Sequence, residues 1–187
     1  MKNFDFTTLK ALAIPEGDVI KIERGNEILW EKAAEFKNLL PLATDTDRKT
    51  IYQGKGFITG YRLSSSGGVT KLDGMCASGF IFPCKPGDVL RIKGIKAKKG
   101  TASYVITYDS SNTKVAHGNL AHTQDGSVWL PSDNAYGNVW QEYDSNSDIL
   151  TITLSSDVFG TNFDALRFSA GVIDENTIVT INQEIPV

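Results

Sequence analysis

The sequence predicts an all-β protein, in which a small N-terminal β-hairpin precedes a larger antiparallel sandwich or barrel. Short runs of alternating apolar and polar residues follow one another along most of the chain, and almost every gap between them carries Gly, Asn, Asp, Ser or Pro. No segment keeps a helical period over a useful length. About ten short strands at this spacing are typical of an antiparallel sandwich or barrel.

Residues 1–32 are expected to form a separate hairpin module. Val19, Lys21 and Glu23 alternate with Ile20, Ile22 and Arg24, residues 25–26 are Gly-Asn, and residues 27–30 return to an apolar pattern. Because a hairpin alone is marginally stable in water, its apolar side chains must be buried against the rest of the chain or against a partner. We favour a partner, and assign the docking face to Ile20, Ile22, Ile28 and Trp30.

Residues 33–47 break the two-residue period and then become polar, so we predict a linker there and a larger domain over residues 48–187. Loops 64–68, 85–88 and 109–112 have the composition of turns that close hairpins. The alternating runs predict strands at residues 49–52, 56–63, 78–82, 89–95, 102–108, 113–117, 128–130, 149–154, 165–169 and 177–181.

Composition limits the class of protein. A domain of about 150 residues buries roughly 70% of its unfolded surface and needs no disulfide or metal ion to fold. Cys76 and Cys84 flank an apolar run; if that run is one strand, the thiols lie too far apart for a disulfide, so we expect buried or half-buried free thiols, compatible with synthesis in a reducing cytoplasm. No apolar stretch approaches membrane-spanning length and no signal peptide is recognisable, which predicts no membrane insertion. A net charge of −3 disfavours nucleic acid as a partner.

The search for catalytic motifs is negative, so we expect no enzymatic activity. His117 and His122 lack the neighbours of a zinc site, and the chain has neither a Gly-x-Ser-x-Gly elbow nor a phosphate-binding loop. A glycosidase needs only two suitably spaced carboxylates and stays open as an alternative. The available acids, Asp73, Asp125, Asp144 and Asp164, lie beside turn residues, where such side chains commonly bond the nearby backbone.

No cofactor is expected, and a structural calcium ion has little support. The acids near predicted strand ends that could bind one are Asp45, Asp47, Asp164 and Glu175, but they do not have the fixed spacing of an EF-hand loop.

Residues 125–143 are the candidate binding surface, because they hold two of the three Trp residues among Asn, Asp, Gln and Ser. Sugar-binding sites pair an aromatic platform with amide and carboxylate groups. We assign the platform to Trp140 or Tyr136 and the hydrogen-bonding groups to Asn134, Asn138 and Gln141. The alternative is that the Trp side chains belong to the core, which we prefer for Trp129 and which is nearly as well supported for Trp140.

Three parts of the chain resemble tail and other virion-associated proteins of phages and prophages of Firmicutes. The N-terminal part is LKALAIPEGDVIKI at residues 9–22 with ILW at 28–30, the middle part is GFIFP at 79–83 with PGDVLRI at 86–92, and the C-terminal part is ALRFSAG at 165–171 with DENTIVTINQEI at 174–185. The resemblance implies a virion protein, made in the bacterial host cytoplasm. It also implies a jelly-roll-like sandwich similar to carbohydrate-binding modules, with the N-terminal module attached to other virion proteins.

The expected function is therefore that of a non-enzymatic virion component, associated with the tail, baseplate or fibre, whose sandwich binds host cell-surface polysaccharide. The alternatives are a purely structural head or tail decoration protein and a small polysaccharide-degrading enzyme. Virion parts assemble symmetrically, so we expect a homo-oligomer and take a trimer as the working assumption.

Overall fold

The computed structural model describes residues 9–13, 19–24, 27–31, 36–43 and 56–186, the first three ranges by their backbone only. The chain divides into two compact units, residues 1–36 and 37–187. The described part is mostly β-structure with very little helix, as the sequence predicts. The predicted strand 49–52 lies outside the described residues, as do the side chains of the docking-face residues Ile20, Ile22, Ile28 and Trp30.

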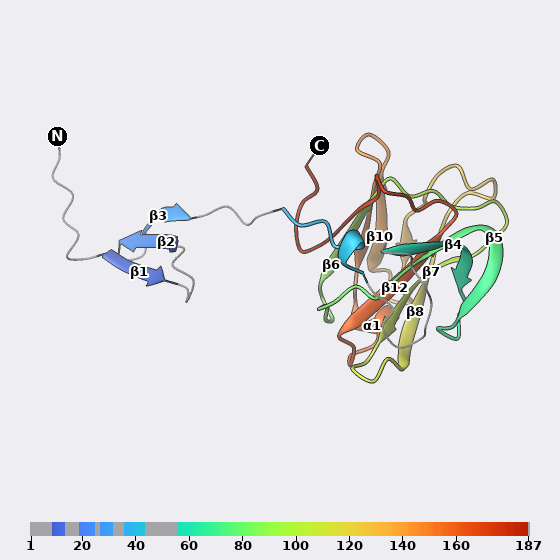
Figure 1. Ribbon diagram of the computed structural model, residues 1–187, viewed down its shortest axis with the longest axis horizontal. Helices are drawn as coiled ribbons and strands as arrows, with labels where there is room; N and C mark the ends of the chain where they lie inside the picture. Colours follow the sequence, from blue (N-terminus) through green and yellow to red (C-terminus); the bar gives the residue numbers. More distant parts are fainter. Residues whose placement is uncertain (1–8, 14–18, 25–26, 32–35, 44–55, 187) are drawn as a thin grey trace. The chain divides into compact units, whose positions relative to one another are not determined.

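The smaller unit contains a three-stranded antiparallel sheet in the order β1-β2-β3 (Figure 1). Its strands are β1 (Leu9–Ala13), β2 (Val19–Arg24) and β3 (Glu27–Glu31). The alternating pattern predicts β2 and β3, but it does not predict β1. That strand has Ala at two of its five positions, and Ala has a low β-propensity.

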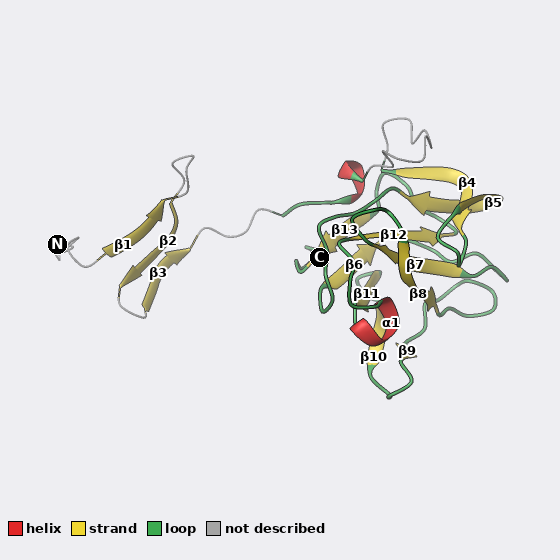
Figure 2. Ribbon diagram, turned by 90° about the horizontal axis from the view of Figure 1, so that it is seen from below, coloured by secondary structure: helices red, strands yellow, loops and turns green. Residues whose placement is uncertain are grey.

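The larger unit contains two five-stranded antiparallel sheets (Figure 2). One has the order β13-β6-β11-β10-β9 and the other the order β4-β5-β12-β7-β8. The strands are β4 (Phe57–Leu63), β5 (Val69–Ser78), β6 (Val89–Lys93), β7 (Ser103–Tyr108), β8 (Lys114–Leu120), β9 (Ser132–Asp133), β10 (Val139–Asp144), β11 (Ile149–Thr153), β12 (Ala165–Ala170) and β13 (Ile178–Ile181). The helical elements are the 3-10 turn η2 (Leu40–Leu42) and the one-turn helix α1 (Ser156–Phe159).

The core lies between the two sheets, so the architecture is β-sandwich-like. Leu90 and Ile92 of β6 lie opposite Ile152 and Leu150 of β11, and all four side chains are fully buried. They belong to one apolar cluster with residues of the other sheet, including Phe168 of β12. Alternation along β6 and β11 is therefore the pattern of strands that bury one face, as the sequence indicates.

Strand β12 is instead buried on both faces. The charged side chain of Arg167 lies at full burial within it, where its Nε donates a hydrogen bond to the carbonyl oxygen of Ser78 at 2.9 Å. The guanidinium carbon lies 5.0 Å from the centroid of the Phe80 ring. This cation–π contact and the hydrogen bond offset the cost of burying the charge.

Three sequence predictions in this unit are wrong. Residues 78–82 are not a strand: β5 ends at Ser78, and beyond it Phe80 and Ile81 form bridges only, that of Ile81 with Leu166. Residues 128–130 also contribute only a bridge, between Trp129 and His122. The turn at residues 85–88 forms, but it does not close a hairpin because β5 and β6 belong to different sheets.

The turns at 64–68 and 109–112 do close hairpins, as predicted. Ser64 N–H donates to the carbonyl oxygen of Gly68 at 2.8 Å between β4 and β5. Asp109 N–H donates to the carbonyl oxygen of Thr113 at 3.0 Å between β7 and β8, and Asn112 takes the positive φ angle that the turn requires.

The predicted linker 33–47 extends too far towards the C-terminus, because residues 37–43 belong to the larger unit. Leu39 N–H donates to the carbonyl oxygen of Val179 at 2.8 Å, and Val179 N–H donates to Asn38 Oδ1 at 2.9 Å. Leu40 and Ala43 are buried in the core cluster. This segment is thus fixed against β13.

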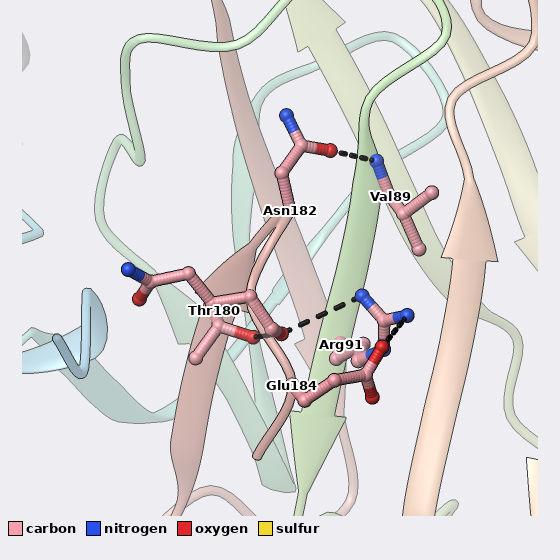
Figure 3. Close-up of polar contacts among 6 residues, drawn as sticks. Val89, Arg91, Thr180, Asn182 and Glu184 are labelled. Carbon is pink, nitrogen blue, oxygen red and sulfur yellow. Dashed lines mark hydrogen bonds and ion pairs between the residues drawn. The ribbon is translucent and has the colours of Figure 1, made fainter. Parts of the chain in front are cut away.

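The C-terminal residues are held against β6 by a set of polar contacts (Figure 3). Asn182 Oδ1 accepts from Val89 N–H at 2.9 Å, and Thr180 Oγ1 donates to the carbonyl oxygen of Gln183 at 2.7 Å. Arg91 and Glu184 form an ion pair at 2.5 Å. These contacts hold residues 182–184 beside β6 and β13.

The cysteines match the expectation of free, buried thiols. Cys76 and Cys84 are both unpaired and buried. Burial, together with the nearby Asp88 and Asp164 carboxylates, raises the pKa of Cys84 to about 12. Among the described residues, no helix has the length and apolar character needed to cross a membrane.

Candidate functional site

A depression beside strand β8 brings together several residues of the sequence-predicted binding surface. We call it the β8 depression; its volume is about 560 Å³. It lies where β8, the outermost strand of its sheet, approaches β9, β10 and α1 (Figure 2). Its lining consists of His117, Gly118, Asn119, Ala121, Ser132, Asp133, Asn134, Ala135, Trp140, Asp157 and Val158.

The turn between β9 and β10 forms one wall of the β8 depression. Asn134 Oδ1 accepts hydrogen bonds from Tyr136 N–H at 2.9 Å and Asn138 N–H at 3.0 Å, and Asn134 N–H donates to the carbonyl oxygen of Asn138 at 2.9 Å. Gly137 supplies the positive φ angle that completes the turn. This arrangement holds the Tyr136 ring at the tip, where 78% of the residue is exposed.

Trp140 does not form an exposed platform, which corrects one of the two sequence assignments. It is 5% exposed, and its ring meets the Phe159 ring edge-on, with the centroids 5.4 Å apart. The pairing register of β10 shifts between Val139 and Gln141, so that Trp140 and Gln141 are both buried despite being neighbours. The core alternative for Trp140 is therefore correct, and only part of the residue reaches the depression.

Gln141 is likewise unable to bind an external ligand. It is fully buried, and its amide is engaged with the backbone: Oε1 accepts from Ala121 N–H, while Nε2 donates to the carbonyl oxygens of Ala121 and Leu130. Its assignment as a hydrogen-bonding group for a ligand is wrong for this reason.

Asn134 lines the depression, whereas Asn138 lies on the same turn outside the lining. The carbonyl oxygen of the Asn134 side chain is used by the turn, and its Nδ2 lies 3.3 Å from Asp157 Oδ2. Asn138 is exposed, and its backbone rather than its side chain takes part in the turn. Of the five assigned residues, Tyr136 and Asn138 are exposed but do not line the depression, while Asn134 and Trp140 line it.

Sequence reasoning missed the polar side chains that β8 and α1 contribute. His117 and Asn119 come from β8, Asp133 comes from β9, and Asp157 comes from α1. No motif marks them, because β8 and α1 are far apart in sequence and only the fold brings them together. The sequence could have indicated Asp133, because this residue lies within the polar stretch 125–143.

His117, one of the lining residues, has an aromatic ring of low basicity that packs against β7. Its ring meets the Tyr104 ring edge-on, with the centroids 5.5 Å apart. Burial, followed by the positive charge of Lys114, lowers the pKa of His117 below its usual value. Near neutral pH the imidazole is therefore uncharged, so it can both donate and accept a hydrogen bond.

The acids considered for catalysis or for calcium do not gather in this depression. Asp125 accepts bonds from Thr123 and Ser127 hydroxyls at 2.6 and 2.7 Å, and those bonds lower its pKa to about 2. Asp144 is held in the same way by Ser147 and by Asn146 N–H. Both follow the turn-forming interpretation. Within the described ranges, no three His, Cys, Asp or Glu side chains are grouped as a metal site would need; Asp45 and Asp47 lie outside those ranges.

The fold places the chain among all-β proteins with two facing antiparallel sheets. Comparison with protein-family models, with curated proteins and with solved structures gave no match.

Proposed function

We propose that this chain is a non-enzymatic phage virion component whose larger unit, a jelly-roll-like sandwich, binds host glycan in the β8 depression. The observation that carries the proposal is the exposed Tyr136 ring beside a depression lined by His117, Asn119, Asp133 and Asp157. The virion assignment rests on the resemblance of the terminal and middle segments to phage structural proteins.

The chemistry of this lining suits a sugar. A pyranose has apolar faces that pack on an aromatic ring and hydroxyl groups that both donate and accept hydrogen bonds. Asn119 offers an amide, Asp133 and Asp157 offer acceptors, and the neutral His117 offers either role. Among the described residues, no hydrogen bond engages the side chains of His117, Asn119 or Asp133, so these groups are available to a ligand.

A purely structural decoration protein is the second candidate, and the burial of Trp140 favours it. That function predicts that the aromatic residues of 125–143 are buried in the core or in a subunit contact. Trp129 and Trp140 are buried in the core, whereas Tyr136 is exposed. The exposure of Tyr136 excludes a role in the core and fits either ligand binding or a subunit contact, so its replacement is the test between the two functions.

A polysaccharide-degrading enzyme is the third candidate, since Asp133 and Asp157 line the same depression. A glycosidase acid must keep its proton near neutral pH, which usually requires burial in an apolar environment. Both Asp133 and Asp157 are exposed to solvent. This exposure favours binding over hydrolysis.

The test is a glycan and cell-wall polysaccharide screen of the full chain, immobilised at high density. Tyr136→Ala and Asn119→Ala should each weaken binding by about tenfold or more, equal to ~1.4 kcal/mol, without changing the circular dichroism spectrum. Phe82→Ala is the control for the loss of an exposed aromatic ring, because Phe82 is 59% exposed and lies outside the turn between β9 and β10 that carries Tyr136.

The absence of binding at any surface density would overturn the glycan-binding proposal. Equal losses for Tyr136→Ala and Phe82→Ala would overturn the assignment to the β8 depression. Release of reducing sugar from a bound polysaccharide, abolished by Asp133→Asn or Asp157→Asn, would favour the enzyme instead.

We propose further that the smaller unit attaches the protein to other virion components. Removal of residues 1–36 should leave the melting temperature of the remaining chain unchanged, because residues 37–187 form a compact unit with its own core. Aggregation of the shortened chain, or a large loss of melting temperature, would contradict this role.

A further inference from the structure

A second depression adjoins the first at the end of β8. It is lined by the segment ahead of β7, residues 100–102, and by the end of β8 and the loop that follows it, residues 119–122 with Gln124. Its volume is about 330 Å³. Asn119 and Ala121 line both depressions, so the two share a border.

The shared border is low and accessible. Asn119 is exposed, and the Ala121 side chain is only a methyl group. The backbone of Ala121 is fixed by the buried amide of Gln141, so this border is part of the rigid framework. No bulky side chain at the border therefore separates a ligand in one depression from the other.

The second depression also has its shape before a ligand binds. The His122 ring joins its two sides, because Nε2 lies 3.0 Å from the carbonyl oxygen of Thr101 in the segment ahead of β7. The His122 ring also packs edge-on against the buried Trp129, with the centroids 5.8 Å apart. A ligand that enters this depression has little loop ordering to induce.

The accessible polar groups continue from one depression into the next. In the part of the chain that the structure describes, the exposed Gln124 and Asn119 side chains take part in no hydrogen bond. Asn119 stands at the border, and Gln124 lies on the far side of it from Asp133 and Asp157. Hydrogen-bonding groups thus follow the outer strand β8 to its end.

From this continuity we infer that the ligand is an extended saccharide chain that occupies both depressions at once, not a single sugar or a chain end. The inference rests on the proposed glycan-binding function. A second sugar covalently joined to the first reaches its depression without a further association cost, so contacts there add directly to affinity.

The experiment uses the polysaccharide that binds most strongly in the screen, cut by mild acid and separated by size from single sugars upward. Affinities of the full chain are measured by calorimetry or by NMR titration. Affinity should rise by about tenfold or more once fragments are long enough to cross the Asn119 border. Gln124→Ala should remove most of this gain and leave the affinity for the shortest binding fragment unchanged.

Two variants complete the design. Asn119→Ala should weaken short and long fragments alike, because Asn119 lines both depressions. Asn162→Ala, an exposed amide outside both depressions, should change neither affinity and controls for a general surface effect.

Equal affinity for all fragment lengths would overturn the extended-chain inference and leave glycan binding intact. A length-dependent gain that Gln124→Ala does not reduce would overturn it too, because longer fragments also gain a statistical advantage from their repeated units. Failure of both polysaccharide and fragments to bind would overturn the proposed function itself.

Discussion

The side-chain amide of Gln141 pairs with both backbone hydrogen-bonding groups of Ala121. Oε1 accepts from Ala121 N–H at 3.1 Å, and Nε2 donates to the Ala121 carbonyl oxygen at 2.8 Å. The same Nε2 donates to the Leu130 carbonyl oxygen at 2.6 Å. The Ala121 carbonyl oxygen also accepts from Leu130 N–H at 3.0 Å, so the amide reinforces a backbone contact between the segment that follows β8 and the segment that precedes β9.

Replacement of Gln141 should therefore destabilise the larger unit. Gln141→Leu keeps a similar volume but removes the amide from Ala121 N–H and from the Leu130 carbonyl oxygen, which costs ~0.5–1.5 kcal/mol for each hydrogen bond lost because both contacts are partly buried. Urea unfolding followed by circular dichroism measures the loss. Glu142→Gln is the control, since Glu142 is the exposed neighbour on the same strand and its replacement should stay within about 0.5 kcal/mol of the original. Equal stabilities of the two variants would contradict this role of the amide.

Gly118→Ala should also destabilise the fold, because two aromatic rings lie against this glycine. A Cβ atom added there would lie 2.8 Å from Phe159 Cζ and 2.9 Å from Trp140 Cη2. Overpacking of this kind costs ~1–3 kcal/mol, and should lower the melting temperature measured by calorimetry.

Gly68→Ala provides the matched control for Gly118→Ala. Gly68 has no positive φ angle, and an added Cβ would lie at an ordinary contact distance of 3.5 Å from Ser64 Oγ. A melting temperature for Gly118→Ala as high as that of Gly68→Ala would show that the aromatic pair moves aside without cost.

Most of the larger unit's strands could be predicted from alternation, because strands such as β6 and β11 bury one face and expose the other. Only Ser78, the last residue of β5, falls within a predicted strand. The rest of β5 is not predicted because Asp73-Gly74, a typical turn pair, lies within it, and Gly74 takes a positive φ angle there. Strand β10 was missed because its register shift buries two adjacent residues and breaks the two-residue period.

The candidate site could be predicted only in part. Asn134 and Ala135 form part of one wall, and Tyr136 and Asn138 lie on the same turn because all four residues are close in sequence. The contributions of His117 and Asp157 depend on how β8 meets α1, and a pairing between distant segments leaves no trace in composition or spacing. Trp140 illustrates a further limit, because the same residue type suits a sugar platform and a core.

The titration of His117 tests the electrostatics of the β8 depression. Burial and the Lys114 charge lower its pKa, so the folded protein protonates this ring less readily than the unfolded chain does. Stability should accordingly fall as the pH decreases from about 6.5, the ordinary His value, through the lowered pKa of the folded state.

NMR titration of the imidazole Cε1 proton measures this pKa directly. Lys114→Gln should raise the pKa of His117 towards the ordinary value, because it removes the nearby positive charge. Lys71→Gln, at an exposed position on another strand, should leave the pKa of His117 unchanged. An unaltered His117 pKa in Lys114→Gln would leave burial as the sole cause of the shift.

The turn around Asp125 should make the stability of the protein depend on pH in the acidic range. Hydrogen bonds from Thr123 and Ser127 lower the pKa of Asp125 from 3.8 to about 2, so the folded turn favours the carboxylate more than the unfolded chain does. Its contribution to stability is therefore complete above pH ~4 and is lost as the pH falls through about 2.

Ser127→Ala removes the 2.7 Å bond from the Ser127 hydroxyl and should raise the pKa of Asp125, as measured by carboxyl-carbon NMR titration. Ser110→Ala, in a different exposed turn, should not change it, and a pKa near 2 retained in Ser127→Ala would mean that Thr123 and the backbone suffice.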